Sequence, residues 1–316
     1  MHFTISTRKA TSNLLIMTTS KTLIFFGNER LVSGLTSTNA PILTALIENG
    51  YKIAAVVSHH SDGQSRNNRE LEVAKVAAEH NIPVLLPKDP IDILDKLRSM
   101  NAEAAILVAY GRLIPQSIID IFPKGIINIH PSLLPKYRGP TPIESAIENG
   151  DLETGTSIMR LSAGMDEGPI YAQTTIPLRG SETKFDLYDM EVEASSELLL
   201  KVLPSILDGS LEPSPQPNDH ATYSKLLTKA DGILDPTSHT ATECERLIRA
   251  HLGFPKTKTT ALGHDIIITK AHVAESAISP LDMSCKDGST LSIDELIAPS
   301  GRTMSASAFL NGYAAG

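Results

Sequence analysis

The sequence predicts an α/β protein with a doubly wound, parallel-sheet N-terminal domain, followed by a smaller, mostly-β C-terminal domain resembling an OB-like barrel. In the first half, apolar runs without alternation recur between helical segments, which indicates a parallel sheet covered on both faces. A proline-rich stretch without periodicity follows at residues 211–219 and is typical of a linker. Beyond it lie short strands broken by Gly and Pro, which favour a small β domain.

The composition narrows the classes of protein to consider. The chain has 316 residues, a net charge of −8, 41% hydrophobic and 20% charged residues, which is globular composition. Two cysteines without metal-ligand spacing predict neither a disulfide framework nor a metal site, so we expect a reducing, cytoplasmic compartment. No run approaches the ~20 apolar residues of a spanning helix, so no membrane partner is expected. The acidic total disfavours non-specific nucleic-acid binding but leaves room for a local basic face.

The elements divide the chain into four parts. Residues 1–20 contain no acidic side chain and include the pair Arg8–Lys9, a composition that a transit peptide can have. We favour a disordered or spurious extension, because a strand opens at Leu23 and Met17 is an alternative start. The remaining parts are a catalytic domain, a linker and a C-terminal domain, at residues 21–207, 208–222 and 223–316.

Apolar runs in the N-terminal domain predict strands at 23–27, 52–57, 82–86 and 104–109, with helices at 41–49, 71–80 and 91–100 between them. Pro41 and Gly50 are typical terminal signals of the first helix. Gly27 ends the first strand, but the chain does not continue as a GxGxxG turn. The missing fingerprint disfavours a nicotinamide-dependent enzyme.

The pattern changes after residue 180. A long helix is predicted at 186–207 and a short helix at 243–251, followed by strands at 266–269, 290–293 and 295–298.

Chemistry-bearing side chains gather after residue 125. In the predicted strand 125–131, Asn128 and His130 share one face and reach the strand end, where α/β folds bind their ligands. Asp166 lies between Gly164 and Gly168, which permit close backbone approach to a ligand. Together they would form an acid/base and oxyanion set. The structural alternatives are a half-buried His with an Asn turn cap, and a solvated turn Asp.

The loop after His130 combines apolar residues, two prolines and two cations in residues 132–140. Such a loop suits a flat apolar ring system with a negatively charged tail. Lys136 and Arg138 are the two cations, and they would meet that tail or a phosphate backbone.

Three segments together resemble the signature of the folate-dependent formyltransferases: 128–130, 132–139 and 165–168. The resemblance covers about residues 23–207 and implies transfer of a formyl group from 10-formyltetrahydrofolate to an amine, without a metal. It implies catalytic roles for Asn128, His130 and Asp166. The implied folate pocket comprises Val108, Ala109, Tyr110, Gly111, Ser132, Leu133, Leu134 and Pro135.

Members of this family act on a purine precursor, on amino-sugar nucleotides or on methionyl initiator tRNA. The C-terminal segments 223–229, 244–250 and 301–313 resemble the members that formylate methionyl initiator tRNA for translation initiation. The implied partners are the charged initiator tRNA and the folate co-substrate. No exposed heptad or long apolar edge demands a further partner, so we expect a monomer.

The distribution of charge agrees with an RNA partner. Residues 246–270 carry five cations and one acidic residue, a basic stripe suited to phosphates, although a solvated charged face remains the alternative. The family's loop between residues 57 and 71 is rich in Lys and Arg, whereas the loop here has two cations, which leaves its acceptor-stem contact open. The predicted tRNA-binding residues are Arg66, Arg69, Lys136, Arg138, Arg246, Arg249, Lys256 and Lys258.

Two alternative functions remain open at this point. An amino-sugar-nucleotide N-formyltransferase needs the same Asn128, His130 and Asp166 but not the basic stripe. A tRNA-binding protein with a degenerate enzyme domain is favoured by the cation-poor 61–69 loop and opposed by the intact catalytic set.

Overall fold

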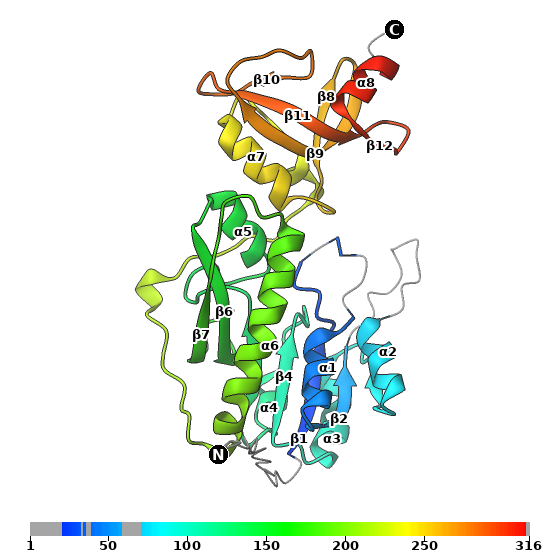
Figure 1. Ribbon diagram of the computed structural model, residues 1–316. Coiled ribbons are helices and arrows are strands. Elements are labelled where there is room, and N and C mark those ends of the chain that lie inside the picture. Colours follow the sequence, from blue (N-terminus) through cyan, green and yellow to red (C-terminus); the bar gives the residue numbers. More distant parts are fainter. Residues whose placement is uncertain (1–20, 33, 36–38, 59–70, 314–316) are drawn as a thin grey trace, which may run out of the picture.

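The computed structural model describes residues 21–32, 34–35, 39–58 and 71–313, which build two β-sheets with their helices (Figure 1). The larger sheet has the strand order β3-β2-β1-β4-β5-β6-β7. Its strands are β1 (Thr22–Gly27), β2 (Lys52–Val57), β3 (Val84–Leu85), β4 (Ala104–Val108), β5 (Ile126–His130), β6 (Glu153–Arg160) and β7 (Ile170–Pro177). The first five pair in parallel, and β6 and β7 are antiparallel additions.

Helices cover both faces of this sheet, as the sequence predicted. Leu23 and Phe25 of β1 belong to one core cluster, whereas Ile24 and Phe26 belong to another on the opposite face. The first face is covered by α1 (Pro41–Glu48), α2 (Glu72–Glu79), α5 (Pro142–Asn149) and α6 (Lys184–Asp208). The second is covered by η1 (Pro90–Ile93), α3 (Leu94–Ser99) and α4 (Gln116–Ile119).

The C-terminal part is a smaller antiparallel sheet with the order β10-β11-β9-β8, and β12 pairs with β11. Its elements are α7 (Ala241–Ala250), β8 (Thr257–Ala261), β9 (His264–Ala274), β10 (Met283–Ser284), β11 (Thr290–Ile297), β12 (Thr303–Ser305) and α8 (Ala306–Tyr313). Helix α7 buries Cys244 and Ile248 against Ile268 and Leu291 of the sheet. A mostly-β C-terminal domain is therefore confirmed, with a half-barrel sheet.

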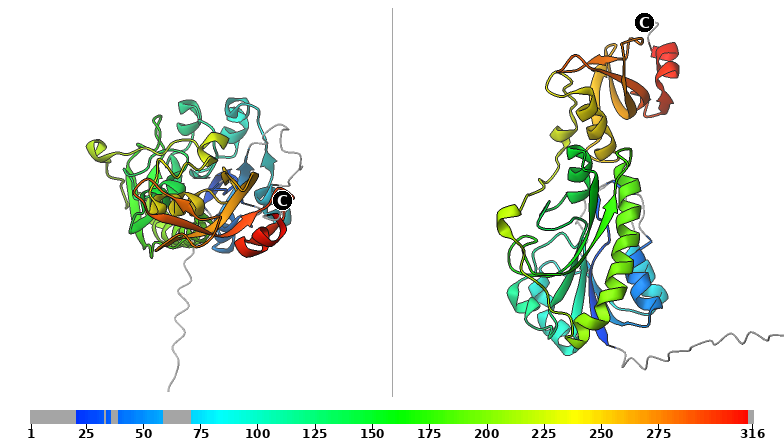
Figure 2. Two further views of the ribbon diagram at one scale, coloured as in Figure 1. Left: turned by 90° about the horizontal axis from the view of Figure 1, so that it is seen from above. Right: turned by 60° about the vertical axis from the view of Figure 1, so that its left-hand side comes forward.

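The linker between the two sheets follows the surface of the N-terminal α/β part instead of leading directly away from it (Figures 1 and 2). After α6 it bridges to β7 through Ile170 and Ser214. It passes through η2 (Asn218–His220), bridges Arg138 to Tyr223, and reaches η3 (Lys229–Gly232). The proline-rich spacer is thus hydrogen-bonded to the loop that follows β5.

Several elements differ from the prediction. The strand predicted at 82–86 is only two residues long, and the helix at 91–100 is split into η1 and α3, where Asp89 forms a capping box with Asp92. The predicted strands 290–293 and 295–298 are one strand, β11, with a register shift at the polar residue Glu295. Helices α4 and α5 and the β6–β7 hairpin had not been predicted, because the turn-rich stretches between motifs concealed their periodicity.

Among the residues that the structure describes, none of the helices is long and apolar enough to cross a membrane.

Candidate active site

Asn128 and His130 are alternate residues of β5 and lie on the same face of the sheet, at the carboxyl ends of the parallel strands. Both are buried, at 4% and 5% exposure. Ile127 and Ile129 pack in the core on the face covered by α1, α2, α5 and α6. Asn128 and His130 alternate with them and therefore lie on the opposite face. Asn128 is the register partner of Leu107 on β4, so the segment Val108–Gly111 begins beside it. The Asn128 amide makes no hydrogen bond with any other described residue, which leaves it available to a ligand.

His130 is held between a carbonyl group and a carboxylate. Its Nε2 lies 2.9 Å from the Tyr137 carbonyl oxygen, and because a carbonyl can only accept, Nε2 carries a proton. Its Nδ1 faces Asp166 Oδ2 at 3.7 Å, too far for a hydrogen bond but close for an ion pair. Asp166 Oδ2 also accepts the Gly139 N–H at 2.8 Å. The three predicted catalytic residues therefore come together, with Nδ1 as the ring nitrogen directed towards the carboxylate.

The β6–β7 hairpin supports the loop that follows β5. Ser157 Oγ donates to the Ser132 carbonyl and accepts the Leu134 N–H, at 2.6 and 3.0 Å. Gln173 Nε2 donates to the Leu134 carbonyl at 2.9 Å. Ser132 Oγ donates to the Lys136 carbonyl at 2.6 Å, which closes the loop on itself. Side chains from two strands missing from the sequence prediction thus fix the loop predicted to bind folate.

Backbone strain gathers around the same residues. Ala109, Tyr137 and Asp166 have φ values of 49°, 56° and 49°, in the left-handed region that non-glycine residues rarely adopt. Such conformations persist only where the surrounding structure enforces them, and they concentrate at functional sites. Burial raises the pKa of both Tyr110 and Tyr137, so both phenols remain protonated near neutrality.

Arg138, which the sequence analysis predicted to contact tRNA, is buried and its guanidinium is hydrogen-bonded within the protein. It is 2% exposed, and its guanidinium donates to Gln216 Oε1, Asn218 Oδ1 and the Tyr223 hydroxyl. Gln216 Nε2 donates in turn to the carbonyls of Asp166 and Gly168. This geometry favours a structural role for Arg138 over a phosphate contact. Gln216 was missed by the sequence analysis, because nothing in a proline-rich spacer marks a residue that bridges two site loops.

The other predicted tRNA-binding residues differ in how far their charges are already paired or exposed. Lys136 pairs with Asp151 at 2.7 Å but keeps a 47% exposed side chain. Arg249 is occupied, because it forms two hydrogen bonds to Glu245 and one to the Glu182 carbonyl, and Arg246 packs half-buried over Gly150. The exposed cations of the C-terminal stripe are Lys256, Lys258 and Lys270. Arg66 and Arg69 lie outside the described residues.

Within the described ranges, His, Cys, Asp and Glu form no group of three that could hold a metal ion.

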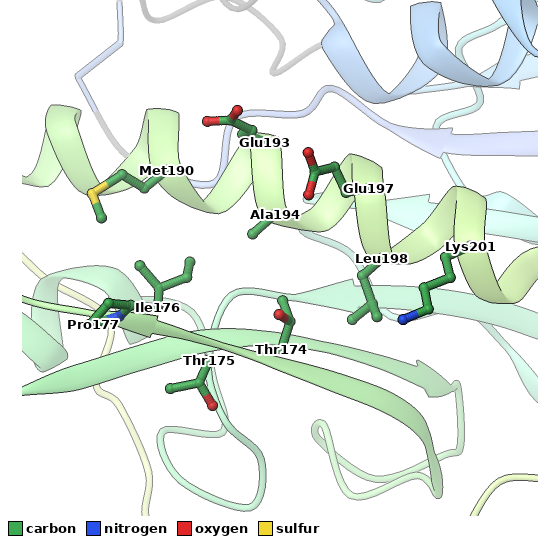
Figure 3. A pocket seen from close by; sticks show the side chains of 10 residues that line it. All are labelled: Thr174, Thr175, Ile176, Pro177, Met190, Glu193, Ala194, Glu197, Leu198 and Lys201. Atoms are coloured by element: carbon green, nitrogen blue, oxygen red, sulfur yellow. The ribbon is translucent and has the colours of Figure 1, made fainter.

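A cavity of about 410 Å³ lies apart from this site, between β7 and α6, and is lined among others by Thr174, Glu193 and Lys201 (Figure 3). It contains none of the predicted site residues.

Comparison with protein families gives two matches along the chain. Residues 30–203 match the model described as formyl transferase, and residues 226–314 match the one described as formyl transferase, C-terminal domain.

Comparison with curated proteins gives relatives along most of the chain. A methionyl-tRNA formyltransferase of Pelobacter propionicus is 30% identical over 93% of this chain and 93% of its own length. The protein of that name from Chloroflexus aggregans is 38% identical over 78% of this chain and 79% of its own. That from Pseudomonas fluorescens is 33% identical, over 85% and 89%.

Solved structures share the fold at low identity. HypX from Aquifex aeolicus, in complex with tetrahydrofolic acid, has a TM-score of 0.64 and 17% identity, over 94% of this chain and 48% of that one. The sugar 3N-formyl transferase WlaRD, in the presence of dTDP and 5-N-formyl-THF, has a TM-score of 0.64 and 20% identity, over 86% and 96%.

Proposed function

This chain belongs to the formyl transferase family, and we propose that it transfers the formyl group of 10-formyltetrahydrofolate to the free amino group of methionine carried by initiator tRNA. It is a one-carbon transferase, and formylation of the charged initiator tRNA serves translation initiation. The observation that carries the proposal is the convergence of Asn128, His130 and Asp166 at the carboxyl edge of the sheet, in a chain that spans nearly the whole length of a relative of that name.

Asn128 supplies the electrophilic assistance in this proposal. The folate co-substrate brings an activated formyl group on its N10 atom. The Asn128 amide has no competing hydrogen bond within the described residues and donates to the formyl oxygen as negative charge develops there. A neutral amide donor fixed on a strand needs little reorganisation during the reaction.

His130 and Asp166 move the proton. Because Nε2 already donates to the Tyr137 carbonyl, Nδ1 is the ring nitrogen that exchanges protons with the reacting amine and the leaving nitrogen. The Asp166 carboxylate, 3.7 Å away and fixed by the Gly139 N–H, compensates the charge of the ring while it is protonated. Asp166 thereby orients and stabilises His130.

The folate pocket that we propose lies between two loops beside these residues. Val108, Ala109, Tyr110 and Gly111 follow β4, and Ser132, Leu133, Leu134 and Pro135 follow β5. The Asn128 amide, which has no hydrogen-bond partner among the described residues, and the enforced backbone at Ala109 fit a polar-edged ring bound at this edge.

For the tRNA, we propose that residues 21–207 form the catalytic domain, 208–222 the linker and 223–316 the tRNA-binding domain. The exposed Lys256 and Lys258 would meet phosphates, with Lys136 near the acceptor end. We further propose that the protein acts as a monomer in the cytoplasm.

The decisive experiment supplies 10-formyltetrahydrofolate with either methionyl initiator tRNA or an amino-sugar nucleotide and follows formyl transfer. We expect formylation of the tRNA alone. Transfer to the sugar, or to neither acceptor, would overturn the proposed function.

A further inference from the structure

Gln216 is the buried residue of a linker that otherwise faces solvent. It is 7% exposed, whereas the other residues from Leu211 to His220, all of which the structure describes, are exposed or half-buried. A proline on each side restricts the backbone, since the proline ring fixes φ. Just before it, two backbone hydrogen bonds of 2.8 Å join Ser214 to Ile170 of β7. The linker therefore presents the Gln216 side chain to the N-terminal part in a fixed position.

The Gln216 amide uses its full hydrogen-bonding capacity. Its Oε1 accepts from Nε and Nη2 of Arg138, at 3.1 and 2.8 Å. Its Nε2 donates to the carbonyls of Asp166 and Gly168, at 2.8 and 2.7 Å. A guanidinium can only donate and a carbonyl can only accept, so this orientation of the amide is the one that satisfies all four contacts. A carboxylate would lack the two donors, and an ammonium group would lack the acceptor.

These four contacts span a hydrogen bond of the proposed catalytic set. Asp166 Oδ2 accepts the N–H of Gly139, the residue after Arg138, at 2.8 Å. Gln216 holds both sides of this hydrogen bond, through the Asp166 backbone on one side and Arg138 on the other. Asp166 has a φ of 49°, a left-handed conformation that persists only where the surrounding structure enforces it. The Gln216 amide supplies part of that enforcement.

We infer that Gln216 is a positioning residue for formyl transfer, because it fixes the Asp166 carboxylate at the place from which it compensates the charge of the His130 ring. The inference rests on the proposed function, in which His130 Nδ1, 3.7 Å from Asp166 Oδ2, exchanges the proton. Gln216 acts through the backbone of the Asp166 loop and not on the reacting atoms. A segment that joins the two parts of the molecule thereby takes part in aligning the catalytic set.

Gln216→Glu separates the two halves of the amide in a test. An oxygen remains to accept from Arg138, whereas the donor to the Asp166 and Gly168 carbonyls is replaced by a second oxygen. Asn218→Ala is the matched control. Asn218 lies in the same linker and its Oδ1 also accepts from Arg138, at 2.6 Å, but it makes no hydrogen bond with Asp166. For each protein, kcat and KM for the folate co-substrate and for methionyl initiator tRNA are measured well below its melting temperature.

We expect Gln216→Glu to lower kcat about 10²-fold and to leave KM for both substrates nearly unchanged, because alignment in the transition state is lost and binding is not. Asn218→Ala should keep kcat within about twofold of the wild type, because the Gln216 amide still holds the Asp166 loop. Gln216→Met removes the donors without adding a charge, and it is judged by the same criteria if Gln216→Glu does not fold.

A double-mutant comparison separates positioning from a general disturbance of the fold. In the Asp166→Ala background, Gln216→Glu should add less than about threefold to the loss of kcat, because the carboxylate that Gln216 positions is absent. An equally large loss in both backgrounds, a loss that appears in KM, or an unchanged kcat would overturn the inference. A wild type that does not formylate methionyl initiator tRNA would overturn the proposed function instead.

Discussion

Two cations two residues apart in one loop serve different purposes. Lys136 extends to the surface and pairs with Asp151, whereas Arg138 turns inward and binds Gln216 and Asn218 of the linker and the Tyr223 hydroxyl. Their sequence neighbourhood is the same, so residue type did not distinguish them. Their partner atoms distinguish the two cations, because a buried guanidinium is tolerated only where several acceptors satisfy its donors.

The Arg138 network predicts a difference in stability. Arg138→Ala leaves Gln216 Oε1 and Asn218 Oδ1 without a donor and should lower the free energy of unfolding by about 2–4 kcal/mol. Lys136→Ala, at an ion pair whose lysine is half exposed, should cost about 1 kcal/mol. Urea denaturation measures both values, and equal costs would contradict the structural role of Arg138.

Asn128 should be essential for rate but not for folding. Its amide makes no hydrogen bond with another described residue, so Asn128→Ala should leave the melting temperature nearly unchanged. Loss of an oxyanion donor should lower kcat about 10²–10³-fold. Steady-state formylation kinetics test this, with exposed Asn311→Ala as the control. Near-normal turnover of the Asn128 variant would remove it from the catalytic set.

Glu191 should make the stability depend on pH. Burial raises its pKa from 4.5 to about 7, and its Oε2 accepts the Thr156 hydroxyl. Between pH 4.5 and 7 the folded state retains a proton that the unfolded state has released, so stability falls as the pH rises through this window. The unfolding free energy of Glu191→Gln should therefore rise by about 3 kcal/mol relative to that of the wild type between pH 4.5 and 8.

The readout is the difference in unfolding free energy between variant and wild type at several pH values. Glu193→Gln, exposed and on the same helix, is the control. Glu29, whose pKa burial also raises to about 7, is present in every protein compared and cancels from the difference. A difference for Glu191→Gln that stays constant with pH would contradict its burial in the protonated form.

At the scale of elements, the close packing of the C-terminal ends of β1 and β4 requires a glycine at position 27. Gly27 has a φ of 136°, and a Cβ there would lie 1.8 Å from the Val108 carbonyl oxygen. Gly27 is not followed by a dinucleotide fingerprint, and the residue is required instead by the close approach of a neighbouring strand. That approach places the Val108–Gly111 segment beside Asn128.

Gly27→Ala should therefore destabilise the protein by about 3 kcal/mol or more, since the backbone of β4 cannot move aside. Gly50→Ala is the matched control. Gly50 also has a positive φ, of 81°, but nothing lies within 4 Å of its Cβ position, so it should cost only about 1–2 kcal/mol of backbone strain. Thermal unfolding compares them, and similar losses would refute the close-approach argument.

At the scale of the whole molecule, the C-terminal sheet is attached through α7. Helix α7 packs on α5, His251 Nε2 contacts Glu148 Oε1 at 2.8 Å, and Arg249 reaches the Glu182 carbonyl. Part of the basic stripe thus holds the two parts together, and the exposed Lys256 and Lys258 remain for an RNA backbone.

The exposure of Lys256 and Lys258 predicts how tRNA binding depends on salt. Replacing both Lys256 and Lys258 with Ala should reduce the slope of log K against log salt by about 1.5, because two phosphate contacts are lost. Lys52→Ala with Lys75→Ala, two exposed lysines of the catalytic part, should leave the slope unchanged. A filter-binding titration across salt concentrations decides, and equal slopes for both double variants would reject the proposed interface.

The sequence by itself determined the doubly wound architecture, the first five strands of its sheet, the helical segments between the first four of them, and the segments that carry Asn128, His130 and Asp166. These follow from local patterns: buried strands are uniformly apolar, helices carry terminal signals, and Asn128 and His130 alternate with core residues on one strand. The family resemblance then supplied the expected roles.

Only the tertiary structure decided which ring nitrogen of His130 faces Asp166, which cations are free, and how the linker ties Arg138 to the Asp166 loop. Each depends on contacts between segments tens of residues apart, such as Gln216 with Arg138 and Ser157 with Leu134. Local periodicity carries no information on such pairings, because a polar side chain in a loop looks the same whether it meets solvent or a partner.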